Sequence, residues 1–158
     1  MLAAATVATL FGVTSPPAWA ASCDETTNPI TISETQQISY GTIAVTNGGG
    51  TVTISTTGGV TAPGGFTVSG VTSAGKFHVT GKQNCSVFIS FLAGSLTGPG
   101  TAMAIRNFTN SAGANPSFST AGGGSLGSVD FSVGADLTVN PSQAGGSYSG
   151  TYTVTVIY

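Results

Sequence analysis

Two stretches of the sequence have the spacing of catalytic motifs. Residues 70–76, Gly-Val-Thr-Ser-Ala-Gly-Lys, have the glycine and lysine spacing of a phosphate-binding loop. However, Phe77 follows where magnesium coordination needs a hydroxyl, and the next residues alternate as in a strand instead of opening a phosphate-binding helix. Residues 123–127, Gly-Gly-Ser-Leu-Gly, have the spacing of a nucleophile elbow, but that motif needs a later histidine and the single one, His78, comes earlier. Neither nucleotide binding nor serine hydrolysis is predicted.

Carboxylates and metal-ligating side chains are few. Asp130 and Asp136 flank a predicted strand, and two carboxylates brought together could serve as a glycosidase pair or a calcium site. Solvated residues at turns and strand edges are the simpler interpretation of both. One histidine and two cysteines cannot supply a structural zinc set. We therefore expect no enzyme activity, no cofactor and no metal.

The charge composition limits the possible partners. Charged residues make up 5% of the 158 residues, against roughly 25% in an ordinary soluble domain. Lys76, Lys82 and Arg106 are the only cations, and three positive charges cannot neutralise a nucleic-acid backbone. With 40% hydrophobic residues, the chain has enough apolar surface to fold. These numbers exclude nucleic-acid binding and charge-driven disorder.

The first twenty residues have the pattern of a signal peptide. An apolar run at 2–13 is followed by two prolines and then by Ala-Trp-Ala at 18–20, a small-x-small cleavage pattern. The apolar run is too short to span a bilayer. We therefore expect residues 1–20 to be removed. The mature chain, 21–158, would pass through the periplasm to the cell surface or an extracellular fibre without a membrane span.

Export also sets the expected state of the two cysteines. In an oxidising compartment, Cys23 and Cys85 are predicted to form one disulfide. A second interpretation is lipidation of Cys23, because residues 20–23, Ala-Ala-Ser-Cys, loosely resemble a bacterial lipobox. Ala20 stands where that motif usually has leucine, so the disulfide ranks first.

The mature chain alternates apolar and polar residues in short runs separated by turn residues, a pattern typical of antiparallel strands. A hairpin is predicted between residues 43–45 and 52–54, because the asparagine and glycines at 47–50 accept the positive φ of a tight turn. Residues 129–139 are predicted as two strands separated by a bulge or sharp turn at Gly134.

These short strands, with no stretch of helical periodicity, predict an all-β fold. Their number and spacing favour an immunoglobulin-like antiparallel β-sandwich. We predict a single domain at 21–158 with an N-terminal extension at 21–35. Residues 111–127, rich in serine, alanine, asparagine and glycine, are expected to form a loop.

The two ends of the mature chain resemble known families. Residues 137–139 (Leu-Thr-Val) and 143–158 (QAGGSYSGTYTVTVIY) look like the end of spore-coat-U-like pilins and of a related bacterial secreted domain family of unknown function. Residues 30–33 and 38–45 resemble the second of these families. The similarity spans most of the mature chain, but the specific motifs lie at its ends.

The resemblance implies a structural subunit of a chaperone–usher fimbria. In such pilins the immunoglobulin-like sandwich lacks its last strand, and a periplasmic chaperone fills the groove. At the outer-membrane usher, the N-terminal segment of the next subunit replaces the chaperone, so that like subunits form a homopolymer. The physical basis is β-augmentation, in which main-chain hydrogen bonds provide the pairing and alternate apolar side chains enter pockets of the groove.

The resemblance also suggests residue roles. Ile30 and Ile32 are the donor-strand candidates. The candidate groove or core residues are Phe88, Tyr152, Val154 and Val156. Family pilins tend to have glycine fourteen residues from the end and tyrosine next to last, whereas here the final aromatic is the last residue. The C-terminal pilin-like strand comprises Gly145, Tyr148, Gly150, Tyr152, Val154, Val156 and Tyr158.

One feature departs from this pattern. Cys23 is the third residue of the expected mature chain, so a bond to Cys85 would tether the segment that should enter a neighbour. Either only residues after Cys23 donate, or the domain is complete by itself. The alternative function is therefore a self-contained secreted or surface-attached β-sandwich that binds glycans or partner proteins.

Overall fold

The computed structural model describes residues 23–46, 48–118 and 126–158, and the predicted signal peptide lies outside them. No helix in these residues is long and apolar enough to cross a membrane. The strands are β1 (Thr31–Gln36), β2 (Ser39–Val45), β3 (Gly50–Ile54), β4 (Val60–Thr61), β5 (Phe66–Ser73), β6 (Gly75–Lys82), β7 (Phe88–Thr97), β8 (Met103–Asn110), β9 (Leu126–Val139) and β10 (Ser149–Ile157).

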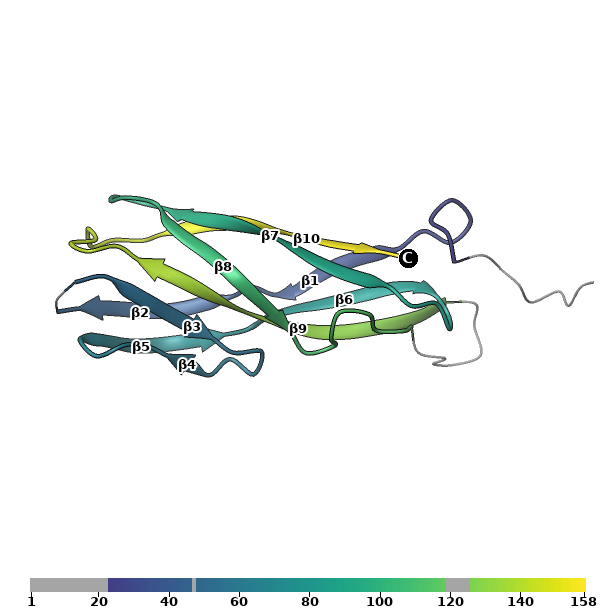
Figure 1. The fold of residues 1–158 in the computed structure, drawn as a ribbon, viewed down its shortest axis with the longest axis horizontal. Helices are drawn as coiled ribbons and strands as arrows, with labels where there is room; N and C mark the ends of the chain where they lie inside the picture. Colours follow the sequence, from purple (N-terminus) through teal and green to yellow (C-terminus); the bar gives the residue numbers. More distant parts are fainter. Residues whose placement is uncertain (1–22, 47, 119–125) are drawn as a thin grey trace, which may run out of the picture.

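Every strand pair is antiparallel, which confirms the predicted all-β class. The main sheet runs in the order β1-β6-β9-β8-β7-β10, with β3 attached to β9 and β4, while β2 and β5 form a separate two-stranded sheet. The molecule is elongated, and its main sheet curls until it nearly closes on itself, with β1 and β10 at the two edges (Figure 1). The immunoglobulin-like sandwich stays a prediction.

The predicted hairpin between residues 43–45 and 52–54 is wrong. β2 pairs with β5, whereas β3 pairs with β4 and β9, so the glycine-rich link joins two different sheets. The reason is burial: Val52 and Ile54 are almost fully buried against the core, a position that pairing with β9 provides. Asn47, the expected turn residue, lies outside the described residues.

The predicted division into two strands at Gly134 is wrong, because β9 is one continuous strand of 14 residues. The pairing of β8 with β9 is irregular there, however, between Arg106 opposite Asp136 and Thr109 opposite Gly134. Gly134 allows a close approach of main chains. A Cβ atom at this position would lie 2.4 Å from the carbonyl oxygen of Ile54. Glycine here therefore lets β3 pack tightly on β9, as the register of the two strands requires.

Two apolar clusters fill the interior. In the first, the Tyr40 hydroxyl donates a hydrogen bond of 3.0 Å to the Ala135 carbonyl and so holds β2 against β9. The second lies beside the disulfide. The first cluster contains Tyr40, Val52, Ile54, Ala74, Met103, Ile105, Ala135, Leu137 and Val139. The second contains Phe77, Val79, Cys85, Val87, Ile89, Phe118, Phe131 and Val133.

Candidate functional site

The two edge strands of the main sheet lie near each other without pairing. Among the described strands, β1 is hydrogen-bonded to β6 alone and β10 to β7 alone. We call the space between β1 and β10 the seam. Five antiparallel steps separate β1 from β10 in the strand order, so the two edges run in opposite directions. An extended chain in the seam would therefore run parallel to one edge and antiparallel to the other.

β10 lines one wall of the seam. Along this strand half-buried and exposed side chains alternate, as expected for a sheet with one face inward. Tyr152, Val154, Val156 and Tyr158 are half-buried and pack against the second apolar cluster. The threonines between them are exposed. The inward face of β10 is thus apolar along its length but incompletely covered.

β1 lines the other wall. Ile32 stands directly opposite Val79, which is 1% exposed, so both side chains point inward. Ile32 is nevertheless 42% exposed, because no described strand covers the free side of β1. Ile30 packs partly against the second cluster. Both donor-strand candidates therefore lie in the fold of their own chain.

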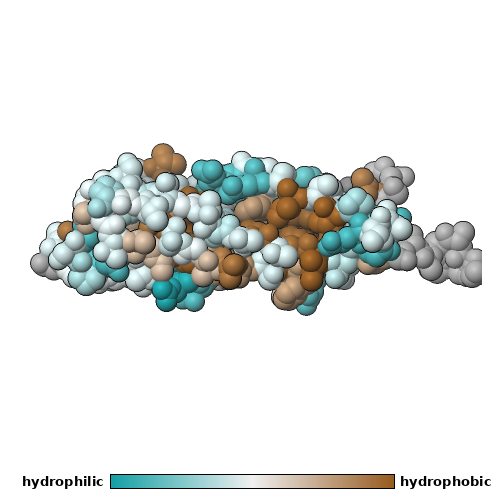
Figure 2. Space-filling view, turned by 90° about the horizontal axis from the view of Figure 1, so that it is seen from above, coloured by the Kyte–Doolittle hydropathy of each residue, from teal (hydrophilic) through white to brown (hydrophobic). Residues whose placement is uncertain are grey.

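Apolar side chains gather on one face in the half of the molecule that carries the C-terminus, where β1 and β10 lie (Figure 2). Phe88, the candidate groove residue, is 47% exposed and stands opposite Ile157 on the outer face of the β7–β10 pair. It therefore points away from the seam.

Two tyrosines of β10 reach across the seam to glycines of β6. A Cβ atom at Gly75 would lie 2.9 Å from the Tyr152 hydroxyl oxygen, and one at Gly81 would lie 2.9 Å from the Tyr158 hydroxyl oxygen. The two glycines are six positions apart in the sequence, and so are the two tyrosines. The seam therefore has a floor made of large side chains from one strand that fit over the small residues of another.

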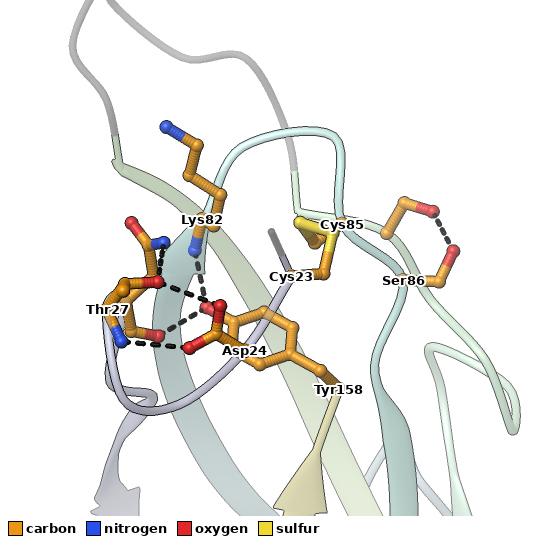
Figure 3. The surroundings of a disulfide bond; sticks show 9 residues. Cys23, Asp24, Thr27, Lys82, Cys85, Ser86 and Tyr158 are labelled. Carbon is orange, nitrogen blue, oxygen red and sulfur yellow. Dashed lines mark hydrogen bonds between the residues drawn. A yellow bond between two sulfur atoms is a disulfide. The ribbon is translucent and has the colours of Figure 1, made fainter. Parts of the chain in front are cut away.

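The end of the seam near the disulfide is closed by Tyr158 (Figure 3). Its hydroxyl donates a hydrogen bond of 2.8 Å to the Asn28 carbonyl and accepts one of 2.8 Å from the Lys82 main-chain N–H. The predicted bond between Cys23 and Cys85 is confirmed, and it lies beside this contact. Because its Sγ atom is in the disulfide, Cys23 is not free to carry a lipid.

Asp24 organises the turn that follows the disulfide. Its carboxylate accepts hydrogen bonds from the side chain and main chain of Thr26 and of Thr27. The hydroxyl of Thr26, the main-chain N–H of Thr27 and the hydroxyl of Thr27 together lower the pKa of Asp24 to about 2. The N-terminal segment is thus shaped by its own contacts before β1 begins.

Tyr152 places an unsatisfied hydroxyl beside Gly75, the first residue of β6. Its ring stacks on Phe108 at 4.9 Å and meets Phe77 edge-on at 6.4 Å. The hydroxyl oxygen is buried and has no hydrogen-bond partner among the described residues. Burial, and then the nearby Glu34 carboxylate, raise the pKa of Tyr152 to about 12. A buried hydroxyl without a partner is costly, so a ligand that offers a hydrogen bond here would relieve that cost.

The other end of the seam is wide. A cleft of about 850 Å³ separates β2 from the start of β10. Tyr148 stands at its rim, where its hydroxyl donates to the Ala144 carbonyl and accepts hydrogen bonds from Gly100 and Gln143. Core side chains are reached from this cleft: Leu96, Met103, Ile105, Leu137 and Val139.

The residues with possible catalytic chemistry do not meet. Asp130 accepts or shares a hydrogen bond of 2.6 Å with His78 on the exposed side of the sheet, whereas Asp136 contacts Thr53 and Asn107. The two aspartates are six residues apart on β9, or roughly 20 Å at the rise of a strand. No cluster of three or more metal-ligating side chains occurs in the described part of the chain.

The two motif-like stretches also lack their required settings. Residues 70–76 cross from β5 into β6, so Lys76 lies in a strand and not at the start of a helix. Residues 123–125 of the elbow-like stretch lie outside the described residues, and Leu126 begins β9.

The comparison with known families gives one match. The model of a domain of unknown function, DUF4402, covers residues 30–158. The chain therefore belongs to the DUF4402 family. No curated protein and no solved structure matches it. The expected resemblance to a domain family of unknown function is thus confirmed, whereas the matches include neither a pilin nor a spore-coat protein.

Sequence reasoning missed Gly75 and Gly81 as parts of the seam. Both fall on the inward face of β6, together with Phe77 and Val79. Their spacing of six residues equals that between Tyr152 and Tyr158, and this match of small with large residues was a usable signal. Gly145, which the resemblance singled out, lies in an exposed turn before β10, with no atom within 4 Å of an added Cβ.

Proposed function

We propose that this chain is a structural subunit of a bacterial surface fimbria, and that another chain completes it by inserting a strand into the seam. A periplasmic chaperone would supply that strand during export. A neighbouring subunit would supply it after exchange at an outer-membrane usher. The chain by itself would be an immunoglobulin-like sandwich that lacks its last strand. The inserted strand would complete it.

The observation that carries the proposal is the pair of unpaired edges at the seam. β1 and β10 both offer free main-chain N–H and C=O groups beside apolar side chains that are only partly covered. An exposed sheet edge of this kind is a template for another strand. The inserted strand would gain main-chain hydrogen bonds and bury alternate apolar side chains against Val154 and Val156.

Two further features support the proposal. The buried hydroxyl of Tyr152 has no partner in the described residues, and an inserted main chain could provide one. The disulfide is also what an exported chain would form in an oxidising compartment.

A peptide-binding experiment tests the proposal. Mature protein, residues 21–158, is mixed with a peptide of about ten residues in which valine and threonine alternate, the length of an ordinary strand. We expect the melting temperature to rise by roughly 5 °C at saturation. We also expect the main-chain amides of β1 and β10 to become protected from hydrogen exchange. A peptide of the same composition with its valines grouped together is the control.

Two matched substitutions test whether the peptide binds at the seam face of β10. Val156→Asp places a charge on the seam face of β10 and should abolish the response to the peptide. Thr155→Asp places the same charge on the exposed face of that strand and should leave the response intact. If the alternating peptide neither raises the melting temperature nor protects the edge amides, the fimbrial proposal is wrong.

The wide cleft favours a second candidate function. Aromatic and amide side chains, Tyr148 and Gln143, stand at the rim of a space of about 850 Å³. Such a site suits a self-contained secreted or surface-attached domain that binds glycans or partner proteins. A stable monomer that ignores strand peptides but binds a sugar in a glycan array would favour this candidate.

A further inference from the structure

The N-terminal segment of this chain is fastened to its own domain. Cys23 is bonded to Cys85, and the Asn28 carbonyl accepts a hydrogen bond from Tyr158. β1 then begins at Thr31 and pairs with β6. Residues 24–30 are therefore a loop held at both ends. Such a loop cannot enter the seam of another copy unless the disulfide opens or β1 leaves its sheet.

The described N-terminal segment is therefore not free to act as a donor strand while the disulfide is closed and β1 is paired with β6.

A carboxylate also lies on the β1 side of the seam, where the side chain of Glu34 is exposed. Glu34 stands opposite Phe77, a buried residue, so its side chain is on the inward face of β1 beside Tyr152. The one ion pair in the described residues joins His78 to Asp130, so Glu34 has no cationic partner there. Residues 23–39 contain no lysine or arginine, so the N-terminal segment of a second copy would bring no cation to Glu34.

We propose that this chain accepts a strand but does not donate one, and that its occupant is a strand from a different protein with a lysine or arginine facing Glu34. The inference rests on the proposed function, because it names the partner of the same seam. A subunit that accepts without donating would stand at one end of a fibre. The remainder of the strand would present apolar side chains at alternate positions, to contact Val154 and Val156.

The test uses mature protein with its disulfide intact and three kinds of fluorescent peptide. One set alternates valine and threonine with a lysine moved through the inward positions. A second set has glutamate in place of that lysine. The third peptide is the chain's own segment, residues 28–39. Dissociation constants are measured for the wild type and for Glu34→Gln, and light scattering of the protein alone follows self-assembly.

We expect one lysine position to bind about tenfold more tightly than its glutamate counterpart, and this preference to vanish in Glu34→Gln. The chain's own segment should bind more weakly than that lysine peptide, and the protein alone should stay monomeric. Polymers that form with the disulfide intact would overturn the inference, as would a lysine preference that survives in Glu34→Gln or no preference at all. If no alternating peptide binds, the proposed function fails with it, whereas binding without charge preference leaves the proposed function standing.

Discussion

The two ends of the seam are built differently. At the disulfide end, a covalent bond joins the N-terminal segment to Cys85, and the hydroxyl of Tyr158, which follows β10, bonds to Asn28 in that segment and to Lys82 of β6. At the other end, Tyr148 bonds to neighbouring loops and a cleft of about 850 Å³ remains between β2 and β10. The contrast teaches that the N-terminal segment and the C-terminal residue are cross-linked at the disulfide end, whereas the other end contains a cleft. We therefore expect an inserted strand to enter from the wide end.

Removing the disulfide should have the largest effect. Cys23→Ala combined with Cys85→Ala frees a loop whose ends are 62 residues apart and should lower the free energy of unfolding by about 4 kcal/mol. Urea unfolding measures this loss. Hydrogen exchange at Gly100, at the wide end, should stay unchanged under native conditions. An unaltered urea midpoint would show that the closed end does not depend on the covalent bond.

Tyr158 at the closed end and Tyr148 at the wide end provide a matched pair of substitutions. Tyr158→Phe removes two hydrogen bonds at the closed end and should cost about 1–2 kcal/mol, with faster exchange of the Lys82 amide. Tyr148→Phe removes the corresponding bonds at the wide end and should speed exchange of the Gly100 amide instead. Amide exchange followed by NMR separates the two. If either variant disturbs both amides equally, the two ends are not independent.

Tyr152→Phe should raise the stability of the empty protein, whereas the substitutions above lower it. The change removes a buried hydroxyl without a partner in the described residues, so the empty protein should gain about 1 kcal/mol of stability. With a strand peptide bound, the gain should shrink, because the wild-type hydroxyl then has a partner. Thermal unfolding with and without peptide measures both states. A loss of stability in the empty protein would mean that the hydroxyl is already satisfied.

The smallest expected effect concerns acid. The pKa of Asp24 is lowered from 3.8 to about 2 in the folded chain, so its contribution to stability is present above pH 3.8 and is lost as the pH falls through 2. Asp24 is only partly buried, so solvent screens its contacts and keeps the effect small. Urea midpoints measured over this pH range should fall less in Asp24→Asn than in the wild type. Equal declines would assign the acid sensitivity to other carboxylates.

Part of this structure could be predicted from local patterns. The alternation of residues 148–158 places tyrosines and valines on one face, and β10 has that arrangement. The expectation of export, together with a count of two cysteines, sufficed to predict the disulfide. The hairpin at 43–54 failed, because a glycine-rich link permits a tight turn without requiring that its two flanking strands pair. Gly134 does not divide β9 into two strands, because glycine in a strand also serves close packing of main chains.

By itself, the sequence determined the all-β class, the inward and outward faces of the strands and the cysteine pairing. The faces follow from the two-residue period of a strand, and the pairing follows because the chain has two cysteines that can oxidise. Both features can be recognised without knowing which strands pair. Only the tertiary structure decided which strands pair, that β1 and β10 remain as open edges, and that Tyr152 and Tyr158 lie over Gly75 and Gly81. Pairing is a competition among distant strands for the same edges and the same core, and no single stretch of sequence records its outcome.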